Sequence, residues 1–441
     1  MSATGPAALL EAARDSPRGL WAHGESWIAH AAPIASAEVW ADEGDRRFTV
    51  AGDAAAELFG RLDGEGVARV YGGFSFSTEG DRTVSSFPAA ILYLPEVELK
   101  HRRGVWTLIA RGRSRAEADE AWDRWADAIV HRMKRRQAPG MGLVPSQPLG
   151  TLTQADGGSP EAAYGAWTRE VGAVLGRIAA GEVDKVVLAR ALDFRPGRRM
   201  DPVELALALW RGNSRSHVFF FEPGKETALV GASPEVLAEV RGRTIRATAV
   251  AGSAPSPVSA AERRRSAVRL LESAKDRDEH DFVAGHIEGT LTDLGCRVRR
   301  DVSPAVLDLG AIQHLETEVT AELPPRVTAL ELLAALHPTP AVCGYPRDAA
   351  RAILKEAESF DREWYAGPVG WLASDGDARF VPALRSAIRK GDSWRLYAGA
   401  GIVGGSDPER EWEETELKFR PMLRAMARAQ CAGGHPGAAG K

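Results

Sequence analysis

Two segments of this sequence place carboxylate side chains at a spacing that puts them on one face of a helix. Asp276 and Glu279 are three residues apart in "SAKDRDEHDFVAGHIEGTL", and Glu411 and Glu414 repeat that spacing in "PEREWEETELK". Residues three apart are neighbours on a helix surface. Carboxylate oxygens are ligands that Mg²⁺ prefers. Two such helices facing each other could hold Mg²⁺, although solvated acidic helix faces would show the same spacing.

The helix that carries Glu411 and Glu414 has a well-marked start. The residues "SDPE" at 406–409 are typical of an N-cap, a proline in the first turn and a capping-box glutamate. Lys418 follows the two glutamates at i+7 and i+4, so it shares their face. Pro421 should kink or end this helix.

The other acidic pair lies on the apolar side of its helix. Val283 and Ile287 continue the stripe that Asp276 and Glu279 begin. Charged groups on an apolar face are costly unless something neutralises them. By spacing alone, solvated acidic helices with ordinary i,i+3 pairs remain the favoured interpretation, and a Mg²⁺ site is the alternative.

A different interpretation comes from the glycines just before the second pair. Gly399, Gly401 and Gly404 match the dinucleotide fingerprint G-x-G-x-x-G. That fingerprint requires a strand, a helix and then a second strand. Only the tail "CAGGHPGAAGK" follows the helix here, so a Rossmann unit and a dehydrogenase are disfavoured.

Composition indicates a globular protein, and a small polar molecule is the first expectation for its ligand. The 441 residues are 44% hydrophobic and 26% charged, with a net charge of −4, which offers no electrostatic footprint for nucleic acid or an anionic membrane. Three cysteines without a C-x-x-C pair indicate neither a disulfide framework nor a zinc site. With no signal layout at the N-terminus, a cytoplasmic location is the expectation.

Four regions are expected along the chain. Residues 1–136 form an N-terminal scaffold of strands, including "RRFTVAG" at 46–52, followed by a helix at 114–136. Residues 137–158 are rich in Gly and Pro and form a loop or linker. Residues 159–430 form the catalytic region, in which strands and helices mix with much hairpin character, and 431–441 are a disordered tail.

The catalytic region begins with a helix and a strand. Ser159 and a C-terminal Gly181 bound the helix. The next segment, "EVDKVVLARALDF", is rich in β-branched residues and reads as a buried strand. Lys185 on this strand points with Val187, away from Asp184. The segment 378–390, "ARFVPALRSAIRK", also reads as a strand.

These residues occur within a longer set of motifs, and with them the chain resembles the chorismate-utilising enzymes, specifically isochorismate synthases. The matching stretches are "VDKVVLARA", "GASPEVL", "AVAGSA", "KDRDEH", "HPTPAVCGYPRDAA", "SFDREWYAGPVGW" and "YAGAGIVGGSDPEREWEET". The resemblance implies a single α/β (α+β) unit. In it, two large antiparallel sheets face each other with helices outside, and the active site lies in the cleft between subdomains.

The activity that the resemblance implies is the Mg²⁺-dependent conversion of chorismate to isochorismate. Water adds at C2, the ring double bonds shift and the C4 hydroxyl leaves. Lys185 corresponds to the general base, and must be able to lose its proton near neutral pH. Glu235 corresponds to the general acid, and must stay protonated until it is needed.

The resemblance also assigns metal and substrate residues. Glu279 and Glu414 correspond to direct Mg²⁺ ligands, and Asp276 and Glu411 to positions that act mostly through water. The substrate would be bound by Gly252, Ser253, His314, Ala341, Tyr365, Arg385, Gly399 and Lys418.

Several alternatives stay open or are disfavoured within this resemblance. Lys185 stands where ammonia-using relatives carry glutamine, which argues against anthranilate synthase, and "AVAGSA" argues against aminodeoxychorismate synthase. Salicylate synthase, which goes on to expel pyruvate, remains the main alternative, and an inactive chorismate-binding protein is another. Val342 departs from a common leucine. A monomer is expected, and the product could serve siderophore, menaquinone or other secondary metabolism.

Overall fold

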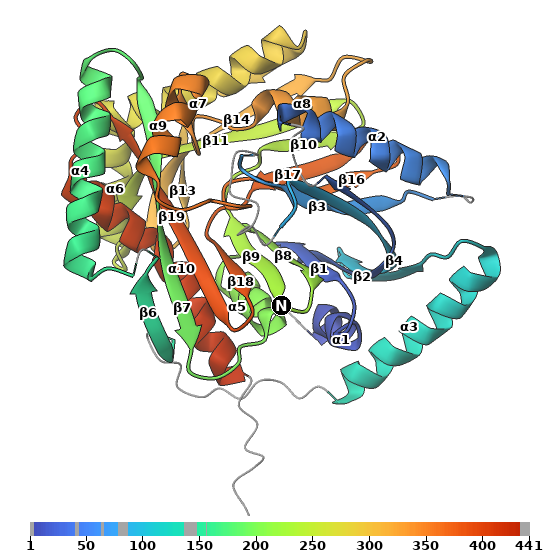
Figure 1. Cartoon of the computed structure of the whole chain (residues 1–441). Helices are drawn as coiled ribbons and strands as arrows, with labels where there is room; N and C mark the ends of the chain where they lie inside the picture. Colours follow the sequence, from blue (N-terminus) through green and yellow to red (C-terminus); the bar gives the residue numbers. More distant parts are fainter. Residues whose placement is uncertain are drawn as a thin grey trace, which may run out of the picture.

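The strands of the described chain form one antiparallel sheet system (Figure 1). The computed structural model describes residues 4–39, 44–62, 66–77, 87–135, 148–155 and 157–432. All recorded strand pairings are antiparallel. The strands are β1 (Arg18–His23), β2 (Ser26–Val39), β3 (Arg69–Phe74), β4 (Ala90–Arg102), β5 (Val105–Ala110), β6 (Gly150–Gln154), β7 (Lys185–Pro196), β8 (His217–Gly224), β9 (Thr227–Ser233), β10 (Ala238–Arg241), β11 (Thr244–Pro255), β12 (Arg297–Arg300), β13 (Ala305–Asp308), β14 (Ile312–Glu322), β15 (Gly344–Tyr345), β16 (Pro368–Ala373), β17 (Ala378–Pro382), β18 (Ser386–Lys390) and β19 (Ser393–Val403).

The strand pairings follow one continuous path that bends back on itself. From β7 it runs through β19, β18, β9, β8, β1, β2, β4, β3, β16, β17, β10, β11 and β14. Residues of β7 and β19 line the same pocket as residues of β11 and β14, so the two ends of the path meet. The expected mixed α/β fold with large antiparallel layers is confirmed, and the layers are continuous through the pairing of β8 with β1.

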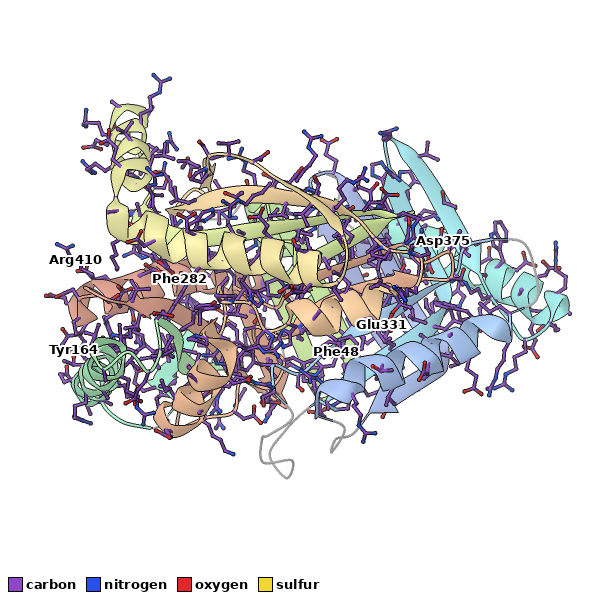
Figure 2. All side chains as sticks on the ribbon, turned by 90° about the horizontal axis from the view of Figure 1, so that it is seen from above. Phe48, Tyr164, Phe282, Glu331, Asp375 and Arg410 are labelled. Carbon is purple, nitrogen blue, oxygen red and sulfur yellow. The ribbon has the colours of Figure 1, made fainter. Side chains whose placement is uncertain are left out.

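Helices cover the outside of this sheet system. Helix α7 packs on β11 and β14, and α10 packs on β19 and α5. Helices α2 and α8, which carry the labelled Phe48 and Glu331, lie side by side (Figure 2). Among the described helices, none is both long and apolar enough to cross a membrane. The helices are α1 (Thr4–Ala12), α2 (Arg47–Gly60), α3 (Arg115–Arg135), α4 (Pro160–Ala179), α5 (Pro202–Gly212), α6 (Ala260–Glu272), α7 (Ala274–Asp293), α8 (Ala329–Leu336), α9 (Arg347–Ala357) and α10 (Pro408–Ala432), with a short 3₁₀ turn at Gly44–Arg46.

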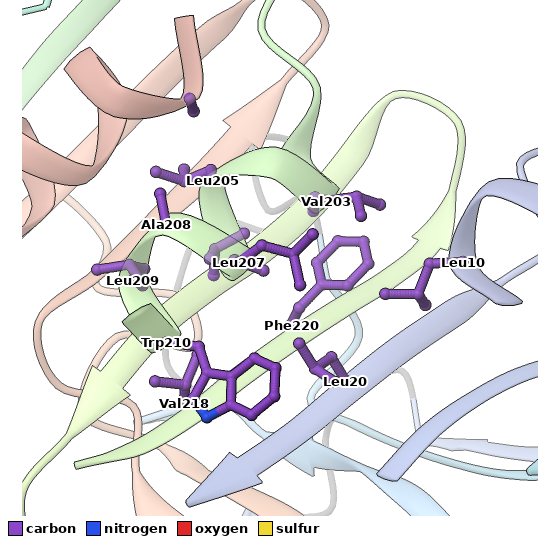
Figure 3. Close-up of a cluster of buried hydrophobic side chains, with 14 of the residues drawn as sticks. Leu10, Leu20, Val203, Leu205, Leu207, Ala208, Leu209, Trp210, Val218 and Phe220 are labelled. Carbon is purple, nitrogen blue, oxygen red and sulfur yellow. The ribbon is translucent and has the colours of Figure 1, made fainter. Parts of the chain in front are cut away.

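Helix α5 shows how the largest core cluster forms. The Asp201 side chain caps it by accepting a hydrogen bond from the backbone N–H of Val203 at 2.9 Å. The residues from 202 to 210 are buried except Glu204. A helix that is apolar on nearly all sides needs partners on both faces. It has them in β8 and β9 on one side and α10 on another, and Trp210 and Phe220 pack in the same cluster (Figure 3).

Three expectations about local structure are wrong. The segment 46–52, expected as a strand, belongs to α2, because Phe48, Ala51 and Ala55 recur at helical spacing and are buried on one face. Strand β6 lies inside the expected loop 137–158, of which 137–147 and 156 fall outside the described residues. The segment 378–390 forms two strands, β17 and β18, separated at Arg385, whose φ is +49°.

Other expectations are confirmed at the level of caps and boundaries. The Ser159 hydroxyl caps α4 by accepting from the N–H of Ala162 at 3.2 Å, and Gly181 follows the helix with φ +74°. Helix α10 begins at Pro408 as expected. It does not end at Pro421, however, and continues to Ala432. The segment beyond Pro421 stays helical because Met422, Ala425 and Met426 are buried in the core.

We predict that Pro421→Ala stabilises the protein. Proline in a helix interior removes one backbone hydrogen bond and disfavours the helix by up to about 3 kcal/mol relative to alanine. The midpoint of thermal unfolding should therefore rise. Pro408→Ala is the matched control, because proline in the first turn costs nothing. A midpoint that falls for Pro421→Ala would mean that the helix depends on the proline ring for packing.

Candidate active site

One pocket gathers most of the residues that the sequence singled out. Those that line it are Glu235, Gly252, Ser253, Glu279, His314, Ala341, Tyr365, Arg385, Gly399, Glu414 and Lys418. The other three contact or adjoin that set, as described below. The pocket's free volume is about 70 Å³, below the usual size of ligand pockets.

Lys185 lies at the start of β7, buried beneath this pocket. Its side chain has no exposed surface, and its Nζ lies 3.0 Å from Oε1 of Glu279. Strand β19 runs alongside, where a Cβ at Gly401 would lie 2.3 Å from that same Oε1 and 3.0 Å from Lys185 Cε. Glycine at 401 is therefore needed for the lysine and the glutamate to meet. One glycine of the supposed dinucleotide fingerprint, Gly401, therefore makes room for this ion pair.

Glu235 follows β9 and is 1% exposed. Its Oε1 is buried without a hydrogen-bond partner. Burial raises the pKa of Glu235 to about 8, against the opposing effect of the positive charge of Lys185. The carboxyl group is therefore mostly protonated at neutral pH, as a proton donor must be.

Helices α7 and α10 bring four carboxylates to one side of the pocket. Burial, with the neighbouring Glu279, raises the pKa of Asp276, and burial with the neighbouring Glu414 raises the pKa of Glu411. Burial is the larger cause of both shifts, and the repulsion of the neighbouring carboxylate adds to it. Lysines offset this repulsion: Lys418 lies 2.6 Å from Glu414.

The same lysine pairing occurs at Glu411, whose carboxylate lies 2.6 Å from Nζ of Lys275. In the described part of the chain, no three His, Cys, Asp or Glu side chains are arranged to hold a metal ion as they stand. The carboxylates of α7 and α10 nevertheless fit a hard divalent cation, because such a cation binds carboxylate oxygens and would relieve the repulsion between these groups. Glu279 and Glu414 face the pocket and could bind it, with the lysine ammonium groups standing in its place.

A β-bulge aims Ser253 at the carboxylates. The register of β11 and β14 shifts between Ala251 and Ser253, with Gly252 at φ +72°. The Ser253 hydroxyl donates to Oε1 of Glu414 at 3.1 Å, and its backbone N–H donates to Oδ1 of Asp276 at 3.2 Å. A Cβ at Gly252 would lie 3.0 Å from the carbonyl oxygen of Asp276, so this turn also sets how closely α7 approaches.

His314 holds Arg385 in place. A guanidinium nitrogen of Arg385 donates to Nε2 of His314 at 2.8 Å, and Nδ1 of His314 is 3.2 Å from the carbonyl oxygen of Gly252. Burial and the charge of Arg385 lower the pKa of His314 well below its usual value. The ring is therefore neutral, with its proton on Nδ1. Arg385 and Lys418 are the cations that line the pocket and could bind substrate carboxylates.

An arginine that the sequence analysis did not single out connects three parts of the pocket wall. Arg362 is buried and donates to the carbonyl oxygens of Val342 and Val187 at 2.7 and 2.6 Å. It also pairs with Glu358, which accepts from the N–H of Ala189 at 2.9 Å. The motif "SFDREWYAGPVGW" contains it, but a motif does not reveal that one guanidinium group links distant segments.

Arg190 is a second residue that was missed. It lies on the strand of Lys185, and its guanidinium group donates to the Thr415 hydroxyl at 2.5 Å and pairs with Glu416 at 3.1 Å. Thr415 adjoins Glu414 on α10. Arg190 therefore fixes the helix that carries two carboxylates against the strand that carries the lysine.

The chain is similar to one protein family and to several known proteins. The family profile described as chorismate binding enzyme matches residues 2–427. The chain is 41% identical over 259 residues to the isochorismate synthase DhbC of Bacillus subtilis, covering 57% of this chain and 65% of that protein, which is less than two thirds of its length.

Two further relatives extend the likeness to most of the chain. A salicylate biosynthesis isochorismate synthase of Pseudomonas aeruginosa is 32% identical, covering 83% of this chain and 76% of that protein. The crystal structure of a putative 2,3-dihydroxybenzoate-specific isochorismate synthase, DhbC from Bacillus anthracis, superposes with a TM-score of 0.75 at 27% identity, covering 96% of this chain and 99% of that chain.

The raised pKa of Glu235 predicts a pH-dependent loss of stability. Between the ordinary glutamate pKa of about 4.3 and about 8, the folded chain keeps a proton that the unfolded chain releases. Stability therefore falls as pH rises through that window. We expect Glu235→Gln to lose less thermal stability than the wild type between about pH 5 and pH 8.

Glu262→Gln, which removes an exposed carboxylate on α6, is the control and should follow the wild type. Parallel curves for Glu235→Gln and the wild type would show that Glu235 is ionised in the folded protein at neutral pH.

Proposed function

This chain belongs to the family of chorismate-binding enzymes, and on that premise we propose that it converts chorismate to isochorismate with Mg²⁺. The observation that carries the proposal is the buried Lys185 beside a pocket lined by Glu235, the pKa of which burial raises to about 8. Exchange of a hydroxyl group by water needs a group that accepts a proton from water and a group that gives one to the leaving oxygen. These two residues can fill the two roles.

Lys185 would take the proton from the attacking water. An ammonium group in contact with Glu279 cannot accept a proton, so this role requires that Lys185 first release its own proton to solvent and act as the neutral amine. The oxygen of that water then forms a bond to C2 of the ring, and the ring double bonds shift. A lysine amine can accept a proton, whereas the amide of a glutamine at this position could not. Lys185 therefore supports water rather than ammonia as the nucleophile.

Glu235 would complete the exchange. Its carboxyl group donates a proton to the C4 hydroxyl as the bond between C4 and oxygen breaks, so that a second water leaves. One proton is accepted and one is donated, and substrate and product are isomers. The poorly hydrated position that raises the pKa of Glu235 keeps the proton available near neutral pH.

The remaining pocket residues would bind and orient the substrate. Arg385, held by His314, and Lys418 offer positive charge to carboxylates, and Ser253 offers a hydroxyl group. Lys418 also donates to the carbonyl oxygen of Gly399 at 2.7 Å, which fixes its ammonium group at the pocket wall. The stacked ring of Tyr365 and the Ala341 backbone would close the apolar side.

Mg²⁺ would be held by Glu279 and Glu414, with Asp276 and Glu411 behind them. When bound, it supplies positive charge that binds the ring carboxylate and favours the loss of the hydroxyl group. The proposal also includes that residues 159–430 carry out catalysis and that residues 1–136 support them. It further includes that the protein is a monomer. The comparison with a salicylate biosynthesis isochorismate synthase keeps salicylate formation as the second candidate.

Product analysis tests the proposed reaction. Purified protein is incubated with chorismate and Mg²⁺, with and without chelator, and the products are separated by chromatography. We expect isochorismate, and its loss with chelator, because the carboxylates alone repel the substrate. Salicylate with pyruvate would assign the second candidate, and unchanged chorismate would leave only a binding role.

The catalytic pair should be separable from substrate binding by mutation. We expect Lys185→Ala and Glu235→Gln each to reduce kcat by about 10²-fold or more, since each removes a proton-transfer group. Lys225→Ala is the control, because this lysine pairs with Asp15 at the surface. Thermal unfolding of each variant checks the fold. Near-normal turnover in a folded Lys185→Ala protein would exclude Lys185 as the base.

A further inference from the structure

A second hollow in the N-terminal part of the structure has a composition that the proposed reaction does not explain. It lies where β1, β2, β4 and β5 face β3, β16, β17 and β10. Its volume is about 670 Å³, within the range of small-molecule sites. It shares no lining residue with the active-site pocket.

The charged residues that line this hollow are all cations. They are Arg69, Lys100, Arg102, Arg103, Arg241 and Arg379. Three acidic residues pair with some of them: Glu98 with Arg69 at 3.9 Å, Glu239 with Arg379 and with Arg241 at 3.1 Å, and Asp377 with Arg241 at 3.2 Å. Lys100, Arg102 and Arg103 make no ion pair with any described residue.

Lys100 lies at the centre of one wall. In the strand registers, Trp21, Ile28, Lys100 and Thr107 form a row across β1, β2, β4 and β5. Burial and the charge of Arg69 lower the pKa of Lys100. An ammonium group beside other cations on a partly buried wall is unfavourable unless an anion joins it.

The opposite wall holds guanidinium groups in fixed positions. Arg69 and Arg241 both lie over the ring of Trp371, each 5.2 Å from the ring centroid. The buried N–H groups of Trp21 (Nε1), Arg69 (Nε) and Arg379 (Nε) have no hydrogen-bond partner in the described structure. All three are donors, and an acceptor bound in the hollow is a partner that they lack, although the carboxylate oxygens of Glu98 are also buried without a hydrogen-bond partner.

We propose that this hollow binds a small anion with two or more acceptor oxygens, such as a phosphate or a dicarboxylate, and that its occupancy is transmitted to the active site. Arginine forks and a lysine around one space are suited to bind such oxygens through charge-assisted hydrogen bonds. The second half of this proposal rests on the proposed function, and the first half does not.

Three neighbouring chain segments connect the two sites. The first segment leads into β10 and runs from Glu235 to Arg241. The second leads into β16 and runs from Tyr365 to Trp371. The third follows β17 and runs from Arg379 to Arg385. In each case the two residues are six positions apart, one at each site. Six residues of extended chain span about 20 Å. Strand β17 pairs with both β10 and β16, so a displacement at one end can move Glu235, Tyr365 and Arg385 together.

Calorimetry with inorganic phosphate and with malonate, at constant ionic strength with chloride as the reference, tests the binding. We expect saturable binding to the wild type and binding at least about tenfold weaker to Lys100→Gln. Lys134→Gln, which neutralises an exposed lysine on α3 outside the hollow, should bind as the wild type does. Equal affinity of Lys100→Gln and wild type, or no binding of either anion, would overturn the proposal.

Turnover of chorismate at constant free Mg²⁺ tests the transmission. Bound phosphate or malonate should change KM for chorismate in the wild type and in Lys134→Gln, and this change should be lost in Lys100→Gln. An effect that persists in Lys100→Gln would place the anion in the active site and refute the transmission. An inactive protein would overturn the proposed function while leaving the calorimetric result intact.

Discussion

The contact between the Lys185 ammonium group and the Glu279 carboxylate, 3.0 Å apart and buried, is the interaction on which the site depends. It joins the sheet end formed by β7 and β19 to helix α7, which packs on β11 and β14 at the other end of the strand path. It exists only because position 401 has no side chain. The same contact neutralises one of four carboxylates that would otherwise repel one another.

The pocket combines two electrostatic environments. On one side Glu235 is buried without a partner and keeps its proton. On the other side the carboxylates of α7 and α10 carry negative charge that lysines offset, as Lys418 does for Glu414. The proposed reaction needs a base for the water that attacks C2 and an acid for the hydroxyl group that leaves C4. Two such groups need different electrostatic environments. Arg190 and Arg362 maintain it by fixing α10 and the Val342 segment against β7.

The chemistry of individual residues was predictable from the sequence, and the contacts between them were not. Spacing alone indicated that Asp276 and Glu279 share the apolar side of a helix, and strand alternation indicated only that Lys185 points away from Asp184. The lysine partner of Glu414 was only suggested by the shared helix face. The bulge at Gly252 depends on pairing between strands far apart in sequence, which local patterns do not contain. The helix at 47–60 was missed because its first residues are β-branched or aromatic and its alanines come later.

The most direct test of the account is to run the reaction in H₂¹⁸O and measure the mass of the product. The account predicts that isochorismate carries one ¹⁸O atom, at C2, because the new hydroxyl group comes from the water that Lys185 deprotonates. Isochorismate without the label would mean that the hydroxyl group moves within the molecule, and would contradict the roles given to Lys185 and Glu235.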